Sequence, residues 1–229
     1  MDVRLVPFTE AALPVVQPWF RHPEVDRRLG GPEWPARELR LLTDKPGGEF
    51  RGRRVLRTHS WLVLNAEEVP VAKIGGDVYD CWTRYLGEAP GGPILDGWEA
   101  GPAMGVAYVV DPGRWRRGFG TAALRAVIAS PVVADVRLFV AGIDADNTAS
   151  SRCARSAGLV PDDPEPDWEG TIHHILRRPA DCSVDEGASL RRPPPVGSQG
   201  RPGARATGPS GPGRTSGTRR RTQAGEADT

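Results

Sequence analysis

The most informative stretch of the sequence is VAYVVDPGRWRRGFGT, residues 106–121. Residues 104–111 predict an apolar strand, a turn follows, and a helix is expected over residues 119–129. In the basic loop between them, Gly118 and Gly120 allow positive φ and let a ligand come close to the backbone. The first N–H groups of a helix can bind an anion. The stretch therefore predicts a strand, an anion-binding loop and a helix in succession.

Two arginines in this loop, Arg116 and Arg117, add charge-assisted donors suited to phosphate oxygens. The glycine spacing fits neither GxxxxGK[ST] nor GxGxxG. Because a tight glycine turn before a helix also occurs without a ligand, the loop alone leaves its role open. A second segment strengthens the case that the loop binds a ligand. Residues 137–143 predict another apolar strand, and DNTASSRCARSAGL, residues 146–159, predicts a helix that Gly158 ends.

Together the two segments resemble the signature motifs of the GNAT acetyltransferases. The loop resembles motif A, (Q/R)xxGx(G/A), and the residues from Asn147 to Leu159 resemble motif B, NxxSxRxxxxxGF. Residues 9–25 resemble the opening helix of the ribosomal-protein and aminoglycoside 6′-N-acetyltransferase branches. The resemblance covers residues 3–178. It implies an α/β (α+β) GNAT fold, a mixed central sheet of six to seven strands flanked by about four helices.

The resemblance also implies acetyl-CoA as co-substrate and no metal. The strand would pair with the pantetheine arm, the loop amides would hold the pyrophosphate, and the start of the second helix would lie near the sulfur end. The residues that this implies for the cofactor are Tyr108, Val109, Val110, Arg116, Arg117, Gly118, Phe119, Gly120, Thr121, Asn147 and Ser150. Two positions depart from the pattern. Trp115 replaces the usual Gln or Arg of motif A, and Ala154 replaces a Tyr that protonates the departing thiolate.

A reaction of this kind is direct attack of an amine on the thioester, so the protein must position both substrates, remove a proton and stabilise an oxyanion. The resemblance implies a backbone N–H of the motif-A strand as oxyanion donor, and we expect that of Val109. Carboxylates among aromatic side chains in residues 77–102 suggest the amine site, because carboxylates bind and deprotonate amines and aromatic faces hold cations. Glu99 and Asp80 are the expected bases, with Glu99 favoured because it lies closer in sequence to the motif-A strand.

The expected substrate-binding residues in this segment are Asp77, Trp82, Asp96 and Trp98. The sequence DGWEA from Asp96 resembles a stretch of the aminoglycoside enzymes, which favours a small-molecule amine such as an aminoglycoside or another polyamine as acceptor. In those enzymes an Asp stands in the motif-A strand where this chain has Ala107. Two other readings stay open: acetylation of a protein N-terminus or lysine, and a non-catalytic module that binds acyl-CoA.

Composition excludes several classes of protein. The formal net charge of +1 gives no electrostatic reason for a nucleic-acid or membrane partner. The three cysteines, without CxxC spacing, argue against a disulfide framework or a zinc site and fit a reducing compartment. The N-terminus lacks the pattern of a secretory signal, so we expect a cytoplasmic protein. GNAT domains often form homodimers, and the sequence identifies no interface for one.

Elsewhere the pattern predicts strands over residues 3–7 and 172–176 and a hairpin of residues 60–64 with 69–74. Thr9 is expected to cap a helix that Pro18 kinks or ends. Residues 22–57 are rich in Pro, Gly and Arg and predict a loop with one short helix over 36–42. An aromatic- and glycine-rich insertion is expected over residues 77–102.

The domain boundary is expected at residue 179. Residues 180–229 contain no Trp, Tyr, Phe, Ile or Met and repeat Arg, Gly, Pro and Ser. Such a segment cannot bury enough apolar surface to offset the entropy of ordering it. The sequence therefore predicts a GNAT domain over residues 1–179 and a disordered tail over 180–229.

Deleting residues 180–229 should leave both the melting temperature and the affinity for acetyl-CoA unchanged, because a tail that buries no core contributes neither. Differential scanning fluorimetry of the full chain and of the truncated chain, with and without acetyl-CoA, checks this. A truncated chain that fails to fold would show that the boundary lies elsewhere.

Overall fold

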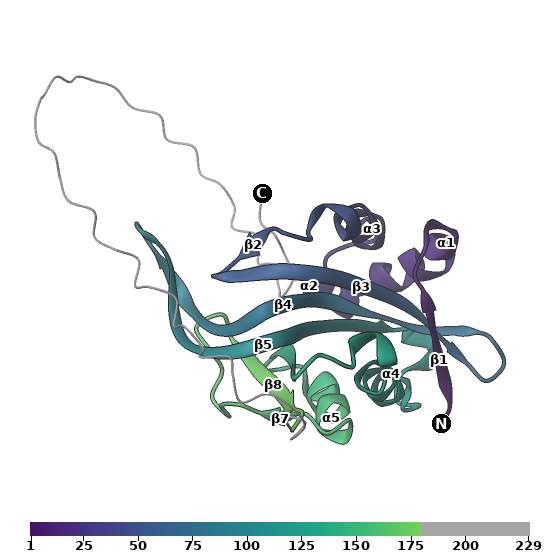
Figure 1. Cartoon of the computed structure of the whole chain (residues 1–229). Coiled ribbons are helices and arrows are strands. Elements are labelled where there is room, and N and C mark those ends of the chain that lie inside the picture. The colour runs from purple at the N-terminus through teal and green to yellow at the C-terminus, as the bar shows by residue number, and fades with distance from the viewer. Residues whose placement is uncertain (180–229) are drawn as a thin grey trace, which may run out of the picture. The chain divides into compact units, whose positions relative to one another are not determined.

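The computed structural model describes residues 1–179, and the predicted tail lies outside the described residues. A mixed sheet of eight strands organises this part of the chain, in the order β1-β3-β4-β5-β6-β8-β7, with β2 against β3 (Figure 1). All the neighbours are antiparallel except β5 and β6. The strands are β1 (Val3–Pro7), β2 (Glu49–Phe50), β3 (Arg53–Asn65), β4 (Pro70–Ala89), β5 (Gly92–Val110), β6 (Leu138–Asp144), β7 (Val160–Pro161) and β8 (Thr171–Arg177). The predicted mixed sheet is confirmed.

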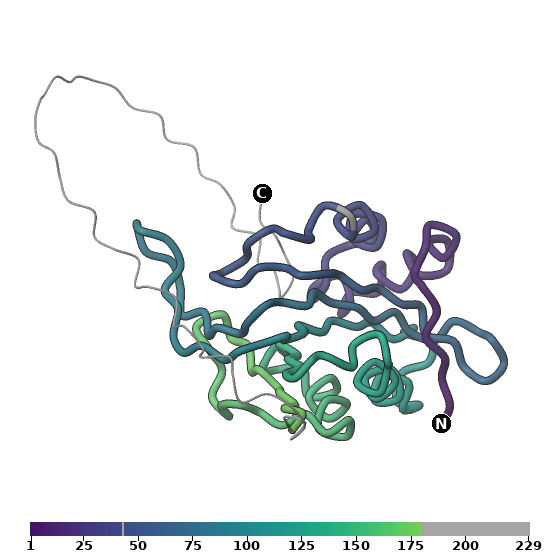
Figure 2. Tube along the Cα trace, viewed as in Figure 1, coloured from purple at the N-terminus to yellow at the C-terminus, as the bar shows by residue number. Residues whose placement is uncertain are grey.

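Helices cover both faces of the sheet. They are α1 (Leu13–Val16), α2 (Pro23–Leu29), α3 (Trp34–Asp44), α4 (Phe119–Ile128) and α5 (Thr148–Ser156), with short 3-10 turns η1 (Glu10–Ala12), η2 (Gln17–Arg21), η3 (Pro112–Arg114) and η4 (Pro131–Val133). The helices of the N-terminal third lie on one face, and α4 and α5 lie on the other (Figure 2).

Alternation along the strands builds a core on each face, because successive side chains of a strand point to opposite sides. On β5, Met104 and Val106 pack with Leu124 of α4 in one cluster. Val109 of the same strand packs with Phe20 in the cluster beneath the N-terminal helices. A single strand thus connects the two cores, and residues of odd and even number on it face different helices.

Several predicted elements are confirmed. The first strand covers residues 3–7 as predicted, the helix from Phe119 forms, and Gly158 ends α5 with a φ of 98°. The predicted hairpin forms around residues 65–69, although both of its strands are longer. Pro18 lies where α1 gives way to a 3-10 turn, but the side chain of Thr9 makes no capping hydrogen bond.

The loop predicted for residues 22–57 is wrong in most of its length. It contains α2, the longer helix α3, β2 and the first residues of β3. Prolines suggested the loop, but Pro23 and Pro35 occupy the first turns of α2 and α3, where a missing N–H costs nothing and the fixed φ suits a helix.

The insertion expected over residues 77–102 is continuous with the sheet. β4 and β5 run through it as a long hairpin whose turn lies at residues 90–91, with Trp82 opposite Glu99 and Tyr85 opposite Leu95. Three bulges interrupt the register. They hide the period of two that identifies a strand in a sequence.

Glycines bring β4 and β5 together where the hairpin enters the sheet. A Cβ on Gly76 would lie 1.7 Å from the carbonyl oxygen of Gly105, and one on Gly75 would lie 2.4 Å from that of His59. Backbone cannot give way as a flexible side chain can. Both positions therefore require glycine because an added Cβ would clash with a neighbouring strand, and not because their φ is positive.

We predict that Gly76→Ala destabilises the protein by at least the ~1–3 kcal/mol typical of overpacking. At about 2–4 °C per kcal/mol for a domain of this size, the melting temperature should fall by several degrees. Gly91→Ala is the matched control, since nothing lies within 4 Å of its added Cβ. Equal melting temperatures for the two variants in thermal unfolding would contradict the close strand contact.

Candidate active site

The parallel strands β5 and β6 pair over three residues only, 103–105 with 138–140. Beyond this point β5 continues to Val110 against β4, and β6 continues to Asp144 against β8. The facing edges of residues 106–110 and 141–144 therefore have no strand between them. We call this opening the V, with its apex at Gly105.

The direction of each backbone group on β5 follows from one hydrogen bond beyond its end. Asp111 N–H donates to the carbonyl of Val71 at 3.0 Å, toward β4. Because donors alternate along an antiparallel strand, Val109 also faces β4. The amides of Val106, Tyr108 and Val110 point away from β4. That of Val106 lies at the apex, where Gly105 still pairs with Val140 of β6, and those of Tyr108 and Val110 face the V. The indole of Trp115 agrees with this, since its Nε1 donates to the carbonyl of Val110 at 2.9 Å.

The loop that follows β5 is shaped to present N–H groups. Arg116 has a φ of 61° and Gly118 a φ of 83°, both left-handed. Gly118 is the N-cap of α4 and supplies no side-chain acceptor to the first turn of the helix. The loop and the positive end of the helix dipole thus lie next to the mouth of the V, an arrangement that suits a phosphate.

Gly120 lets α4 approach the V closely. A Cβ at this position would lie 3.1 Å from Sγ of Cys153 and 3.3 Å from a ring carbon of Tyr108. The second glycine of the loop is therefore required for packing between α4, α5 and β5, whereas Gly118 is required for its backbone conformation.

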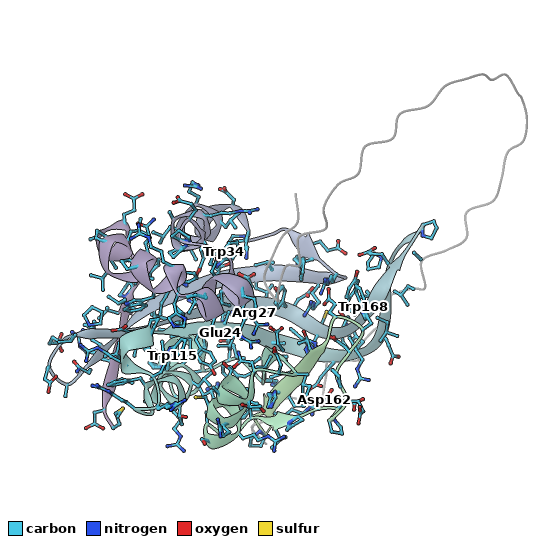
Figure 3. All side chains as sticks on the ribbon, turned by 180° about the vertical axis from the view of Figure 1, so that it is seen from behind. Glu24, Arg27, Trp34, Trp115, Asp162 and Trp168 are labelled. Atoms are coloured by element: carbon cyan, nitrogen blue, oxygen red, sulfur yellow. The ribbon has the colours of Figure 1, made fainter. Side chains whose placement is uncertain are left out.

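Helix α2 spans the mouth of the V on the other face. His22, at its N-cap, packs edge-on against Trp115 with ring centroids 4.5 Å apart. Arg28 Nη1 lies 2.7 Å from Asp144, the last residue of β6, and 2.8 Å from Asp146 just after the strand. The hydrogen bond from Arg28 lowers the pKa of the Asp146 carboxyl. Figure 3 shows Arg27 of α2 and Trp115 on the same side of the protein.

Helix α5 begins beside the V. The Asn147 side chain accepts the N–H of Ser150 at 3.1 Å, so it caps the helix. The hydroxyl of Tyr108 donates to the carbonyl of Ser150 at 3.3 Å, and burial raises the pKa of this phenol. Ala154 is fully buried against Leu159 and other core residues. The position at which motif B often carries a Tyr therefore faces the core in this chain.

A cavity of about 100 Å³ lies on the α3 face of the sheet, next to the apex of the V. Gly75, Gly105 and Ala107 form part of its floor. Asp77, directly opposite Gly105 in the register, is buried there. Its carboxylate accepts the Lys45 ammonium at 2.9 Å and the Thr58 hydroxyl at 2.8 Å.

A second ion pair stands beside it. Lys73 is buried and its Nζ lies 2.6 Å from both carboxylate oxygens of Glu38, which also accepts the hydroxyl of Ser60 at 3.0 Å. The cavity wall is thus a chain of charged groups carried by α3, β3 and β4 on the face of the sheet that α4 does not cover.

Residues 2–160 match the family model described as Acetyltransferase (GNAT) domain. The chain belongs to this family. It is a GNAT N-acetyltransferase, as motifs A and B predict. A curated relative, an uncharacterized N-acetyltransferase YfmK of Bacillus subtilis, is 26% identical over 170 residues, which are 73% of this chain and 92% of that protein.

Solved structures share the fold of this GNAT acetyltransferase. An aminoglycoside acetyltransferase, AAC(6')-Ib, in complex with coenzyme A has a TM-score of 0.56 and 18% identity, and covers 77% of this chain and 95% of its own. A spermidine N-acetyltransferase from Vibrio cholerae, in complex with CoA and spermine, has a TM-score of 0.52 and 7% identity, with coverage of 77% and 95%. At these identities the likeness concerns the fold.

The residues predicted to bind the amine lie in two different openings of the protein. Asp77 and Trp82 line the cavity. Asp96, Trp98 and Glu99 line a neighbouring hollow of about 580 Å³, which shares Trp82 with the cavity and also contains Asp162 and Trp168, labelled in Figure 3.

The two predicted bases are engaged outside the cavity. Glu99 is held by the guanidinium of Arg177, with contacts of 2.9 Å and 2.8 Å. Asp80 accepts the backbone N–H of Arg54 at 2.9 Å and lines neither opening. Their roles stay a prediction, and neither group lies where the V meets the cavity.

Sequence reasoning missed three groups of the cavity: the Glu38–Lys73 pair, the His173–Asp167 pair at 3.2 Å, and Arg53. Of the two adjacent histidines of β8, His174 is buried and His173 is partly exposed, because successive side chains of a strand point to opposite faces. Nothing in the sequence signalled these pairs, because their members lie on different elements.

Within residues 1–179 no helix is long and apolar enough to cross a membrane. In the same residues no group of three or more His, Cys, Asp or Glu side chains is placed to hold a metal ion.

Arg117→Glu should abolish stabilisation by acetyl-CoA, because it places a carboxylate beside the proposed pyrophosphate site. At about 100 times Kd, a ligand stabilises the native state by ~2.7 kcal/mol, which is about 5–10 °C in melting temperature at this size. Thermal shift with acetyl-CoA measures it. Arg37→Glu on α3, with the same change of charge, should keep the full shift. An unchanged shift in Arg117→Glu would show that the loop does not hold the phosphates.

Proposed function

We propose that this enzyme transfers the acetyl group of acetyl-CoA to a primary amine of a small molecule. One observation carries the proposal: the V joins the anion-binding loop at its mouth to the charged cavity at its apex. An extended cofactor bound along the V would therefore present its thioester at the cavity. The aminoglycoside and spermidine enzymes with this fold support an amine as acceptor.

The loop and the open edge would divide the binding of CoA between them. The amides around Gly118 and the charges of Arg116 and Arg117 would hold the pyrophosphate. The backbone of Tyr108 and its neighbours on the open edge would pair with the pantetheine arm as a strand pairs with a strand.

The oxyanion donor must point into the V. Since the N–H of Val109 faces β4 and that of Val106 lies where β5 still pairs with β6, we assign the role to the amide of Tyr108, next to Ala107 on the cavity floor. A backbone N–H fixed in a strand needs no rearrangement as charge develops on the thioester oxygen.

Asp77 is the proposed base. It lies opposite Gly105, at the apex, and its carboxylate accepts hydrogen bonds from Lys45 and Thr58. The amine would attack the thioester carbon, the C–S bond would break, and the proton lost by the nitrogen would pass to Asp77. With Ala154 buried, the thiolate would leave without a tyrosine acid.

Asp77→Asn should lower kcat by about 10²–10⁴-fold, the range of a positioned base. Activity should recover in part at high pH, where the acceptor amine is already neutral. Release of free CoA, measured across pH with amine and peptide acceptors, checks this. The thermal shift with acetyl-CoA should stay intact in the variant.

Glu99→Gln and Asp80→Asn serve as comparisons, because both carboxylates lie outside the cavity. We expect each to change kcat by less than about threefold, far below a base's contribution. A larger loss in either of them than in Asp77→Asn would return the base to the residues that the sequence favoured. A rise in KM alone for Asp77→Asn would reduce Asp77 to a binding group.

A further inference from the structure

Arg53, the first residue of β3, brings an uncompensated positive charge to the cavity. Its side chain is 95% buried, since only 5% of the residue is exposed. Its Nε and Nη1 are buried and have no hydrogen-bond partner among the described residues. Buried polar groups of folded proteins are almost always paired, so an unpartnered pair of donors on one side chain calls for a ligand.

Aromatic rings surround this guanidinium. Its central carbon lies 4.0 Å from the ring centroid of Trp82, 4.8 Å from that of Tyr79 and 5.5 Å from that of Phe50. Aromatic faces attract a cation and hold the side chain in place. They leave Nε and Nη1 without a hydrogen-bond acceptor. The rings therefore orient the guanidinium while its N–H groups stay available.

The other titratable groups that line the cavity have partners. Lys73–Glu38, Lys45–Asp77 and Arg51–Glu169 are ion pairs, and His173 makes a hydrogen bond with Asp167. Each of these carboxylates already has a basic partner within the described residues. Arg53 has none in that part of the chain, and burial lowers the pKa of its guanidinium. A buried charge without a partner is unfavourable, so an anion that entered the cavity would relieve that cost.

We propose that the acceptor carries an anionic group, a carboxylate or a phosphate, in addition to the amine, and that Arg53 binds this group. The inference rests on the proposed function and names the class of its substrate. A planar guanidinium with two free donors suits the paired oxygens of such an anion. Polycations such as spermidine carry no anionic group that could accept hydrogen bonds from these donors.

The neighbouring hollow does not reverse this charge argument. Of its carboxylates, Asp96, Asp162, Asp163 and Glu165 are exposed to solvent. The two that are partly buried, Glu99 and Asp167, contact Arg177 and His173. A carboxylate in water is already solvated and gains little from pairing with a cation, whereas Arg53 is cut off from water. Arg53 therefore selects for an anionic group on the part of the acceptor that enters the cavity. The hollow would accommodate only a distal part of the acceptor.

Matched acceptors test the proposal. L-Lysine against cadaverine differs by one carboxylate, and phosphoethanolamine against ethanolamine differs by one phosphate. Spermidine and kanamycin represent polycations. With acetyl-CoA and the full chain, kcat/KM should favour the anionic member of at least one pair by about tenfold or more, the scale of one charged contact. The pair that shows the preference distinguishes carboxylate from phosphate.

Arg53→Met should remove this preference by lowering kcat/KM for the anionic acceptor, and Arg53→Lys should restore part of it. Arg54→Met is the matched control, since Arg54 is exposed and lies next in sequence but outside the cavity. A second measurement needs no turnover. With the phosphate loop of residues 116–121 saturated by CoA, acetate or inorganic phosphate, compared with chloride at equal ionic strength, should raise the melting temperature of the wild type and of Arg54→Met but not of Arg53→Met.

The outcomes separate the two proposals. No release of CoA from any acceptor would contradict the proposed function, while an anion-dependent shift that disappears in Arg53→Met would still support the anion site. Acetylation of cadaverine, spermidine or kanamycin without preference for an anionic twin, together with no shift that depends on Arg53, would overturn the anion proposal and leave acetyl transfer standing.

Discussion

The separation of β5 from β6 is the constraint on which the site depends. Strands that part after three residue pairs leave backbone N–H and C=O groups on two facing edges, and such groups must find partners or remain unpaired at a cost. In this chain the indole of Trp115 satisfies one of them, the carbonyl of Val110. The amides of Tyr108 and Val110 face the V. The surrounding helices are arranged around this opening, and an extended ligand that carries amides fits it as a missing strand.

The sheet also keeps the two proposed substrates on different sides of the same backbone. Even-numbered residues of β5 face α4, whose first turn follows the anion loop, and odd-numbered residues face α3 and the cavity. Three glycines, Gly75, Gly76 and Gly105, remove side chains from the point where the sides meet. Asp77 is the first buried carboxylate beyond that point on β4. Transfer of the acetyl group between the two substrates then requires that they meet only at the apex of the V.

Local features of this arrangement were predictable from the sequence. The loop glycines, the helix starting at Phe119 and the end of α5 at Gly158 depend on neighbouring residues, and the family followed from two motifs. The cavity depends on contacts over long distances in sequence, such as Lys73 with Glu38, which no local pattern encodes. The direction of the Val109 amide depends on the register with β4, which a single strand does not reveal. Bulges in β4 and β5 concealed the hairpin that separates Glu99 from the cavity.

An open strand edge is also the surface on which foreign chains add and aggregates begin. This enzyme keeps its open edge inside the V, where α2 crosses the mouth through Arg28 and His22 and where α4 and α5 pack close at Gly120. A polypeptide strand carries side chains on both faces and would need room that these helices occupy. The slender pantetheine arm of CoA needs far less room than a polypeptide strand. The same enclosure that suits the edge to the proposed cofactor therefore keeps it from pairing with a strand of another chain, because the width of a ligand determines whether it can enter.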